Sequence, residues 1–538
     1  MAAVNIKKSR PVGAGISKYT LMLVLAAVIL LPLVRMMASL DAGDFKAVLD
    51  SPHFLSALSN SVVYTLAATL ISVGVAYLLA ICTVRVDIRC KQLFVILLTL
   101  PMLIPSISHG TGLIILFGSN GIITNLLGLG GSSYIYGAPG IIIGSVMYAF
   151  PVAFIMLSDV LRYEDMAVYE AADILGISRI RSFARISLPY MKKPLLAAFF
   201  STFAMIVTDY GVPLRIGGQE KTLSSLMYET AIGRSELGQG AVFGLVLLVP
   251  ALLAFAVDLL SKERASSSFV TSSGTRRKTA AQKIGAYAFC IFMVIFSLLP
   301  IAAFVLLSVV ENYPNNMTLT AENYTFILKG DGWQYLLNSL WIALLTALVG
   351  TAIGFCTAYL TARMKSPAAK VLHLLSITSM AIPGMVLGIS YLMTFAGSAI
   401  YGTVLILVMV NTAHFLSSPY LMMYNSFGKM NENLEAVGAT LGIGRLRMLG
   451  RVFLPQSLGT LAEMFSYLFV NSMMTISAVA FLATSSTRPI SLMIKELERS
   501  PKMGRIAVVS LLILAVNIAI KIIVERVKSA ASRRRLET

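Results

Sequence analysis

The sequence predicts an all-α polytopic membrane protein with two parallel six-helix repeats. Three observations support this fold class. The chain is 57% hydrophobic and only 13% charged, its apolar residues form long unbroken segments, and the order of its motifs repeats once. A soluble protein has roughly a quarter of its residues charged, so this low charge content indicates a surface that largely faces lipid.

Twelve apolar segments are long enough to cross a bilayer as helices, which takes about 20 residues each. They are continuous and show no period-two alternation, so helices are favoured over the strands of a membrane barrel. The predicted spans lie near 19–38, 60–84, 92–117, 138–160, 194–212, 239–260, 284–310, 338–362, 369–396, 402–424, 456–482 and 506–524.

The positively charged residues predict the orientation. The formal net charge is +18, and Lys and Arg cluster on alternate connections, for example at Arg85, Arg179, Arg363 and Arg445. By the positive-inside rule this side is cytoplasmic, so both termini are predicted to be cytoplasmic. Because the basic residues lie in short segments between apolar runs and not on one aromatic-rich face, nucleic-acid binding is disfavoured.

Two copies of one unit follow each other in the chain. Asn60 recurs as Asn338, and Pro189 recurs as Pro455 at a smaller offset because the first copy has a longer outer loop at 118–134. Since each copy holds six spans, both insert in the same direction and a pathway can form between them. A duplicated scaffold without a pathway is the alternative. The predicted domains are an N-terminal cytoplasmic segment 1–18, a first half 19–260, a cytoplasmic linker 261–283, a second half 284–524 and a basic tail 525–538.

The connection after the fourth span of each copy carries the clearest motif. Each loop, 163–190 and 428–456, begins with a stretch compatible with a short helix and has a glycine where that helix should stop. Each then reaches Leu-Pro, where proline fits the first turn of the next helix. The residues of this motif are Glu170, Ala171, Ala172, Gly176, Leu188 and Pro189 in the first loop, and Glu435, Ala436, Gly442, Leu454 and Pro455 in the second.

This motif resembles the EAA loop of binding-protein-dependent ABC importer permeases, which have the type I, MetI-like fold. The first loop matches the family consensus. In the second, Ala436 occupies the glutamate position and Glu435 comes one residue early, about 100° around a helix. The resemblance implies that a short helix of each loop docks in a groove of an ATPase subunit and transmits its movement. We expect the two loops to make unequal contacts; a basic loop that only anchors the spans is the alternative.

The resemblance also implies partners. It predicts a non-enzymatic permease of the bacterial inner membrane, served by a homodimeric ABC ATPase in the cytoplasm and an extracytoplasmic solute-binding protein. The ATPase would bind ATP and Mg²⁺, and this chain would bind no cofactor; it has no GxxxxGK[ST] phosphate loop.

The substrate is predicted from the resemblance alone. The fused arrangement and the TDYGVP stretch look most like permeases for 2-aminoethylphosphonate, with ferric iron, thiamine and polyamines as alternatives. An ion-coupled secondary transporter is the rival class. It would need coupling-ion sites at mid-membrane, where this chain has few carboxylates.

Polar residues inside the predicted spans are candidates for the pathway or gate. The cysteines have no CxxC spacing, and His109 and His414 do not occupy corresponding positions, so neither a metal site nor a catalytic set is predicted. Pro101, Pro105 and Pro383 should kink the third and ninth spans. The candidate pathway residues are Asp209, Tyr210, Glu463, Asn471, Thr475 and Ser477, with a structural bond as the alternative for Glu463.

Overall fold

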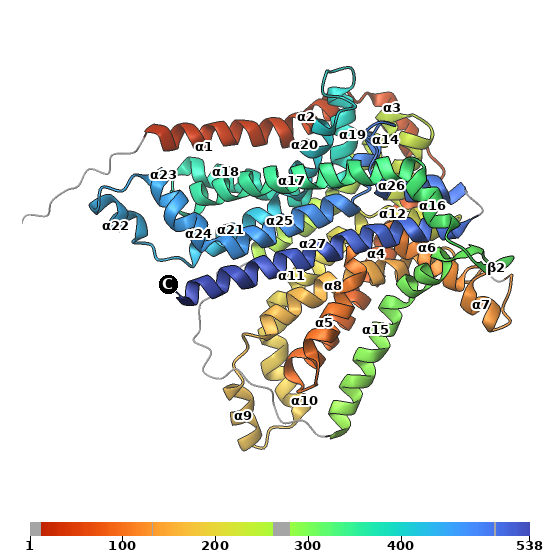
Figure 1. The fold of residues 1–538 in the computed structure, drawn as a ribbon, viewed down its shortest axis with the longest axis horizontal. Helices are drawn as coiled ribbons and strands as arrows, with labels where there is room; N and C mark the ends of the chain where they lie inside the picture. Colours follow the sequence, from red (N-terminus) through yellow and green to blue (C-terminus); the bar gives the residue numbers. More distant parts are fainter. Residues whose placement is uncertain (1–11, 132, 262–279, 500–501, 538) are drawn as a thin grey trace, which may run out of the picture. The chain divides into compact units, whose positions relative to one another are not determined.

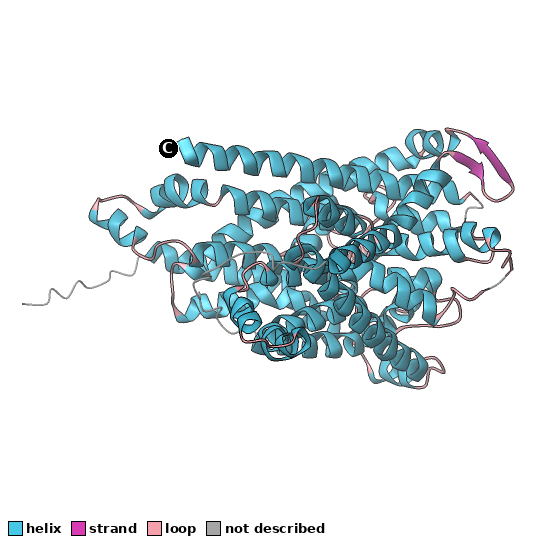
Figure 2. Ribbon diagram, turned by 90° about the horizontal axis from the view of Figure 1, so that it is seen from below, coloured by secondary structure: helices cyan, strands magenta, loops and turns pink. Residues whose placement is uncertain are grey.

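The computed structural model describes residues 12–131, 133–261, 280–499 and 502–537. Its elements are almost all helices (Figure 1). Within the described part, the strands β1 (Val310–Asn312) and β2 (Asn316–Leu319) form one antiparallel hairpin, drawn in magenta in Figure 2. The all-α fold class is confirmed. Most of the predicted linker and of the N-terminal segment lies outside the described residues.

Nine helices in the described part are long and apolar enough to cross a membrane, and two further helix pairs pass the same test with a bend. This makes up to eleven spans by length and composition, against the twelve predicted. The difference is the predicted span 456–482, because its helix ends at Met474 after 17 residues and Thr475 takes an extended conformation. Seventeen residues lie at the lower limit for crossing a bilayer. The predicted span 194–212 is also displaced, to Ile180–Val207.

The chain divides into two compact units that do not coincide with the two halves of the sequence. Unit 1 contains residues 1–39, 336–489 and 516–538, and unit 2 contains residues 40–335 and 490–515. In unit 1, helices α1 and α2 from the start of the chain pack on α18 and α19. In unit 2, helix α15, which begins the second half, packs on α5 and α6 (Figure 1). Each unit therefore includes the first helix of the other half.

The elements of unit 1 are α1 (Val12–Leu25), η1 (Ala26–Leu30), α2 (Leu31–Ala38), most of α17 (Asp331–Ala362), α18 (Pro367–Thr378), η6 (Ser379–Ala381), α19 (Gly384–Phe395), α20 (Val404–Phe415), α21 (Ser417–Gly428), α22 (Leu434–Thr440), α23 (Arg445–Met448), η7 (Leu449–Phe453), α24 (Leu454–Gln456), α25 (Leu458–Met474), η8 (Val479–Phe481) and the second part of α27 (Met503–Glu537).

The elements of unit 2 are α3 (Ala42–Leu49), α4 (Phe54–Ala80), η2 (Ile81–Arg85), α5 (Lys91–Thr99), η3 (Leu100–Leu103), α6 (Ser106–Phe117), α7 (Ile122–Leu126), α8 (Ala138–Leu161), α9 (Ala167–Ile174), α10 (Arg179–Ser182), η4 (Phe183–Ser187), α11 (Leu188–Val207), α12 (Gly211–Ile216), α13 (Leu223–Tyr228), η5 (Glu229–Gly233), α14 (Leu237–Ser261), α15 (Ala280–Ser308), β1, β2, α16 (Glu322–Lys329), α26 (Ile490–Glu496), η9 (Leu497–Arg499) and the first part of α27.

The prolines break the third and ninth spans as predicted. Helix α6 begins only after Pro105, and the 3₁₀ turn η3, which contains Pro101, separates it from α5. In the ninth span, α19 begins after Pro383 and is bent by 105° from the helical segment before it. Proline has no N–H for the helical hydrogen bond of the preceding turn, so a break at these residues is the expected response.

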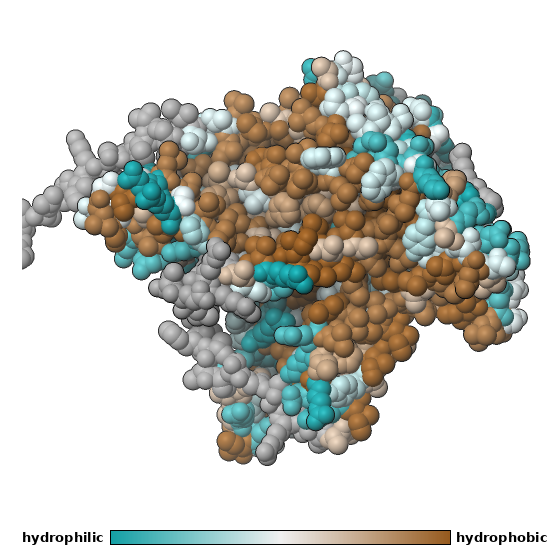
Figure 3. Space-filling model, viewed as in Figure 1, coloured by the Kyte–Doolittle hydropathy of each residue, from teal (hydrophilic) through white to brown (hydrophobic). Residues whose placement is uncertain are grey.

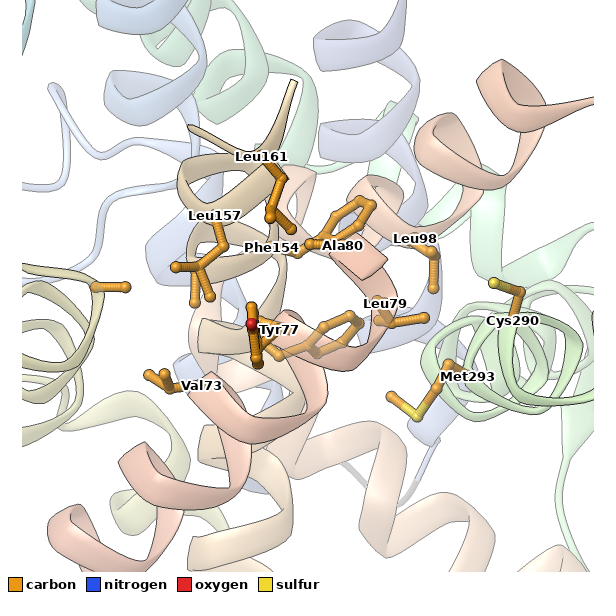
Figure 4. Packing of buried hydrophobic residues seen from close by; sticks show 14 of the residues in the cluster. Val73, Tyr77, Leu79, Ala80, Leu98, Phe154, Leu157, Leu161, Cys290 and Met293 are labelled. Atoms are coloured by element: carbon orange, nitrogen blue, oxygen red, sulfur yellow. The ribbon is translucent and has the colours of Figure 1, made fainter. Parts of the chain in front are cut away.

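The core of unit 2 is built by close packing of α4 against α8, with α15 added on one side. Figure 4 shows Tyr77 and Leu79 of α4 beside Phe154 of α8, while Cys290 and Met293 of α15 approach from another direction. The described large apolar residues that are exposed lie mainly on the spans, where they can face lipid, and Figure 3 shows brown apolar residues over much of the displayed face.

The repeated asparagines explain one element of the internal symmetry. Asn60 Nδ2 donates a hydrogen bond to the carbonyl of Lys221 at 3.1 Å, and Asn338 Nδ2 donates to the carbonyl of Arg488 at 3.1 Å. Each asparagine therefore holds the segment that follows the fifth helix of its own half. Each side chain thus donates to a backbone carbonyl of a connecting segment.

Candidate coupling loops and pathway residues

The two loops after the fourth spans fold into the same short helix with the same ending. Helices α9 and α22, called here the loop helices, are followed by Gly176 and Gly442, and both glycines have φ of +67°. In each loop the glycine N–H donates a hydrogen bond to the carbonyl three residues before it, that of Asp173 or Ala439, at 3.1 Å. The N–H of the next residue, Ile177 or Ile443, bonds to Ala172 or Gly438 at 2.9 and 2.8 Å. This is a Schellman motif, which requires a left-handed residue and therefore favours glycine.

The sequence prediction that a glycine ends each helix is thus confirmed. A Cβ added at Gly176 or Gly442 would meet no atom within 4 Å. The glycines are therefore required by the backbone conformation and not by lack of space.

The motif residues differ in exposure. Glu170 and Ala171 are exposed on α9, whereas Ala172 is buried; Ala436 is exposed on α22. Large apolar side chains are also exposed at corresponding places of the two loops. Leu175 and Ile180 are 75% and 84% exposed in the first loop, and Leu441 and Leu446 are 68% and 86% exposed in the second.

As predicted, each Leu-Pro pair lies in the first turn of a helix, Pro189 in α11 and Pro455 in α24. Each of these helices directly continues a helical segment of the loop. Pro189 and Pro455 each follow a π-helical turn, η4 or η7. In these turns Leu188 N–H bonds to the carbonyl of Phe183, and Leu454 N–H bonds to that of Leu449. A wider π turn just before proline accommodates its missing N–H without ending the helix. Leu188, Pro189, Leu454 and Pro455 are all exposed.

A buried arginine joins the first loop to the end of the second span. Arg85 Nη2 is ion-paired with Glu164, and it donates hydrogen bonds to Tyr169 Oη at 3.1 Å and Ser187 Oγ at 2.9 Å. The Tyr169 hydroxyl in turn donates to Glu164 Oε1 at 2.5 Å. Burial and this hydrogen bond raise the pKa of Tyr169 to about 12, so the hydroxyl stays protonated and can donate. The guanidinium also lies 5.1 Å from the centre of the Tyr169 ring.

The equivalent arginine in the second half makes the same kind of connection with different partners. Arg363 forms a bidentate pair with Glu435, with Nε–Oε1 and Nη2–Oε2 distances of 2.8 and 2.5 Å. It also donates to the carbonyls of Met430 at 3.0 Å and Asn431 at 2.7 Å. The centre of the Phe453 ring lies 5.5 Å from its guanidinium. The hydrogen bond from Glu435 raises the pKa of Arg363.

Sequence reasoning missed this arrangement. The sequence indicated that the two arginines are basic residues of the inner side and that they end corresponding spans. It gave no role to Glu164, and it placed Glu435 one residue early for the motif glutamate. In the structure Glu435 pairs with Arg363 inside unit 1. The signal that could have found the connection is the matched position of the two arginines at the ends of corresponding spans, each with a carboxylate in the following loop.

The pathway candidates of the first half have visible structural contacts. Asp209 follows α11, and its Oδ2 accepts a hydrogen bond from Val212 N–H at 3.1 Å in the first turn of α12. Ser224 Oγ donates to the Asp209 carbonyl at 2.7 Å. Tyr210 is buried and stacks on Tyr228, with ring centres 4.8 Å apart. Both residues therefore fix the break after the fifth helix.

The candidates of the second half do not form one cluster. Glu463 of α25 pairs with Lys528 of α27 at 2.8 Å, which is the structural alternative considered from the sequence. Asn471 Nδ2 donates to the Tyr467 carbonyl of its own helix at 2.8 Å. Thr475 and Ser477 follow that helix, with their hydroxyl oxygens 3.4 Å apart. Among the described residues no group of three or more His, Cys, Asp or Glu could hold a metal ion.

Comparison with known proteins agrees with this geometry. The family model for the binding-protein-dependent transport system inner membrane component matches the chain twice, at residues 72–264 and 350–533, together more than half of its length. A putative ferric transport system permease protein of Haemophilus influenzae is 25% identical over 458 residues, which cover 82% of this chain and 72% of that protein.

Two further relatives show the range of the similarity. A ferric transport system permease protein of Actinobacillus pleuropneumoniae is also 25% identical over 82% of this chain, which spans 66% of that protein's length. A sulfate transport system permease protein of Salmonella typhimurium is 24% identical over 48% of this chain and 96% of its own length. The protein therefore belongs to the family of binding-protein-dependent transport system inner membrane components, as a fused two-half permease of an ABC importer.

Proposed function

We propose that this permease forms the translocation pathway for a small solute that an extracytoplasmic binding protein delivers. A homodimeric ABC ATPase on the cytoplasmic side would dock on the loop helices α9 and α22. The ATPase would bind ATP and Mg²⁺, and both termini of the permease would lie in the cytoplasm. Membership of the binding-protein-dependent family supports the two partners in general terms.

The observation that carries the docking proposal is the matched exposure of apolar residues on the two loops. Leu175 and Leu441 directly precede the two Schellman glycines, and Ile180 and Leu446 also occupy corresponding positions. All four side chains are largely exposed. Leu175, Leu441 and Leu446 lie outside the helices that could cross a bilayer, and Ile180 is the first residue of the span Ile180–Val207. Large apolar side chains exposed to water on a defined backbone are typical of a protein–protein contact.

The proposed mechanism is mechanical. Closure of the ATPase on ATP would move the docked loop helices, and this movement would open and close the pathway between the membrane helices. A short helix with a fixed ending can transmit a rigid-body movement, whereas an irregular loop would deform. The pathway residues Asp209, Tyr210, Glu463, Asn471, Thr475 and Ser477 stay proposals for the gate.

Co-purification tests the docking proposal. Full burial of a leucine side chain contributes about 1.5–3 kcal/mol, so the exposed parts of Leu175 and Leu441 can each contribute about 1–2 kcal/mol to docking. The double variant Leu175→Ser/Leu441→Ser should therefore weaken ATPase binding by about 30- to 1,000-fold. Leu126→Ser is the matched control, because Leu126 is also largely exposed, at 82%, but lies on α7, at the far end of the third span.

The rival transporter class makes an opposite prediction. Vesicles that contain this chain alone, with an ion gradient and no nucleotide, should transport nothing if the proposal is right. Uptake under those conditions would contradict it, and so would an unchanged yield of ATPase with the leucine double variant.

For the substrate we propose two candidates, ferric iron and 2-aminoethylphosphonate. The names of two relatives that align with most of this chain support ferric iron. The resemblance of the TDYGVP stretch supports 2-aminoethylphosphonate, and thiamine and polyamines remain alternatives. Uptake of radioactive ferric iron and of 2-aminoethylphosphonate, compared between cells with and without this gene, separates them. The transported solute should lose its ATP-dependent uptake when the gene is deleted.

A further inference from the structure

We propose that Arg85 and Arg363 are positioning residues that fasten each loop helix to the end of the second span of its half. The contacts of these two residues are called here the arginine clamps. The inference rests on the proposed function, because it assigns the residues through which movement of the docked helix reaches the membrane helices.

The loop helices depend on such anchors because they are too short to be stable alone. They have eight and seven residues, whereas isolated helices shorter than about 12–15 residues are marginal in water. Few of their own residues are buried. On α9 these are Tyr169 and Ala172, and on α22 only Gly438. The orientation of each loop helix must therefore come largely from side chains that cross to other elements.

Each clamp joins four segments of its half, namely the segment that carries the arginine and three segments that the arginine contacts. In the first half, Arg85 ends η2 and contacts Glu164 after α8, Tyr169 on α9 and Ser187 in the π turn η4. A second bond, between Tyr77 Oη of α4 and Ser187 Oγ at 3.0 Å, closes the same connection. The second span, the loop helix and the start of the fifth helix are thus joined through one guanidinium.

In the second half, Arg363 follows α17 and contacts the loop carbonyls after α21, Glu435 on α22 and the Phe453 ring in the π turn η7. Tyr169 and Glu435 occupy corresponding positions, seven residues before the glycines Gly176 and Gly442. The two halves therefore connect the same four places with different side chains. Because the two halves make the same connection with different side chains, the feature they share is the link between the loop helix and the spans, and not one type of residue.

The clamp also assigns Glu435 to an internal contact. Both carboxylate oxygens bond to the guanidinium of Arg363, whose side chain is nearly buried. A buried ion pair that loses one partner leaves an uncompensated charge, so Glu435 would not leave Arg363 to pair with the ATPase. The second loop helix would then dock through exposed apolar residues such as Val437 and Leu441, while the first also offers the exposed Glu170.

The test uses the whole complex, with the permease, its ATPase and its binding protein in vesicles. The probe is ferric iron or 2-aminoethylphosphonate, according to the uptake assay, and the readout is solute transported per ATP hydrolysed. Glu435→Gln removes the charge and keeps the shape. Since residues that carry coupling change it by about 0.5–2 kcal/mol, we expect about a 2- to 30-fold loss of transport per ATP. The ATPase should still co-purify in full.

Two further variants make the test specific. Tyr169→Phe keeps the ring beside Arg85 and removes only the hydroxyl, so transport per ATP should fall about 2- to 10-fold. Glu432→Gln is the matched control, because Glu432 forms an exposed ion pair with Lys365 at 3.8 Å close to the second clamp. Such surface pairs contribute little, so this variant should behave as the wild type.

The outcomes separate the clamp from the proposed function. A wild-type permease that retains no ATPase would contradict the proposed function itself. If the wild type is coupled, unchanged transport per ATP in both Glu435→Gln and Tyr169→Phe would overturn the clamps. Loss of the ATPase from Glu435→Gln would also overturn the internal assignment of Glu435, since it would place this residue in the ATPase contact.

Discussion

The two Schellman glycines allow a quantitative prediction. Gly176 and Gly442 have φ of +67°, and a Cβ at either position would meet nothing within 4 Å. Substitution by alanine therefore causes no clash, and its cost is the left-handed conformation alone, about 1–2 kcal/mol for an L-residue. That free energy lowers the ratio of formed to open helix ends by about 5- to 30-fold. Asparagine tolerates this conformation better than alanine, so the order of stability should be Gly, then Asn, then Ala.

Hydrogen exchange measures this effect directly. In the Gly442→Ala variant the amide of Ile443, which bonds to the Gly438 carbonyl, should lose protection by about 5- to 30-fold if it exchanges through local opening. Gly444→Ala is the matched control in the same loop, because Gly444 has an ordinary φ of −64° and equally open surroundings. Equal protection of Ile443 in the wild type and Gly442→Ala, or equal loss in both variants, would refute the reasoning.

Two other predictions concern unit 2. A Cβ at Gly112 of α6 would lie 2.5 Å from Cβ of Pro300 on α15, so Gly112→Ala should destabilise this packing by about 1–3 kcal/mol, measured as a lower midpoint of thermal unfolding. The hydrogen bond and charge of Lys502, with a contribution from Arg505, lower the pKa of Glu322 below 4.5. A depressed pKa stabilises the folded state at higher pH, and this contribution is lost as the pH falls through the folded value. Between about pH 5 and pH 3 the unfolding midpoint should therefore fall more steeply in the wild type than in Glu322→Gln; parallel curves would contradict this.

Features that depend on a few neighbouring residues could be predicted from the sequence. The breaks at Pro105 and Pro383 follow from the missing N–H of proline, and the ends of the loop helices follow from glycines that alone adopt a positive φ without strain. The position of Pro189 in the first turn of α11 also follows from its missing N–H, whereas the π turn directly before it could not be predicted from the sequence.

By itself, the sequence determined that the chain is an all-α membrane protein with two copies of one unit, because segment length, hydropathy and motif order are properties of the chain alone. Only the tertiary structure decided which helices share a unit and which charges pair. Helix α15 packs with the first half, Arg85 pairs with Glu164, and Arg363 pairs with Glu435. These contacts join residues far apart in the sequence, and a buried charge takes whichever partner the fold brings within hydrogen-bond distance.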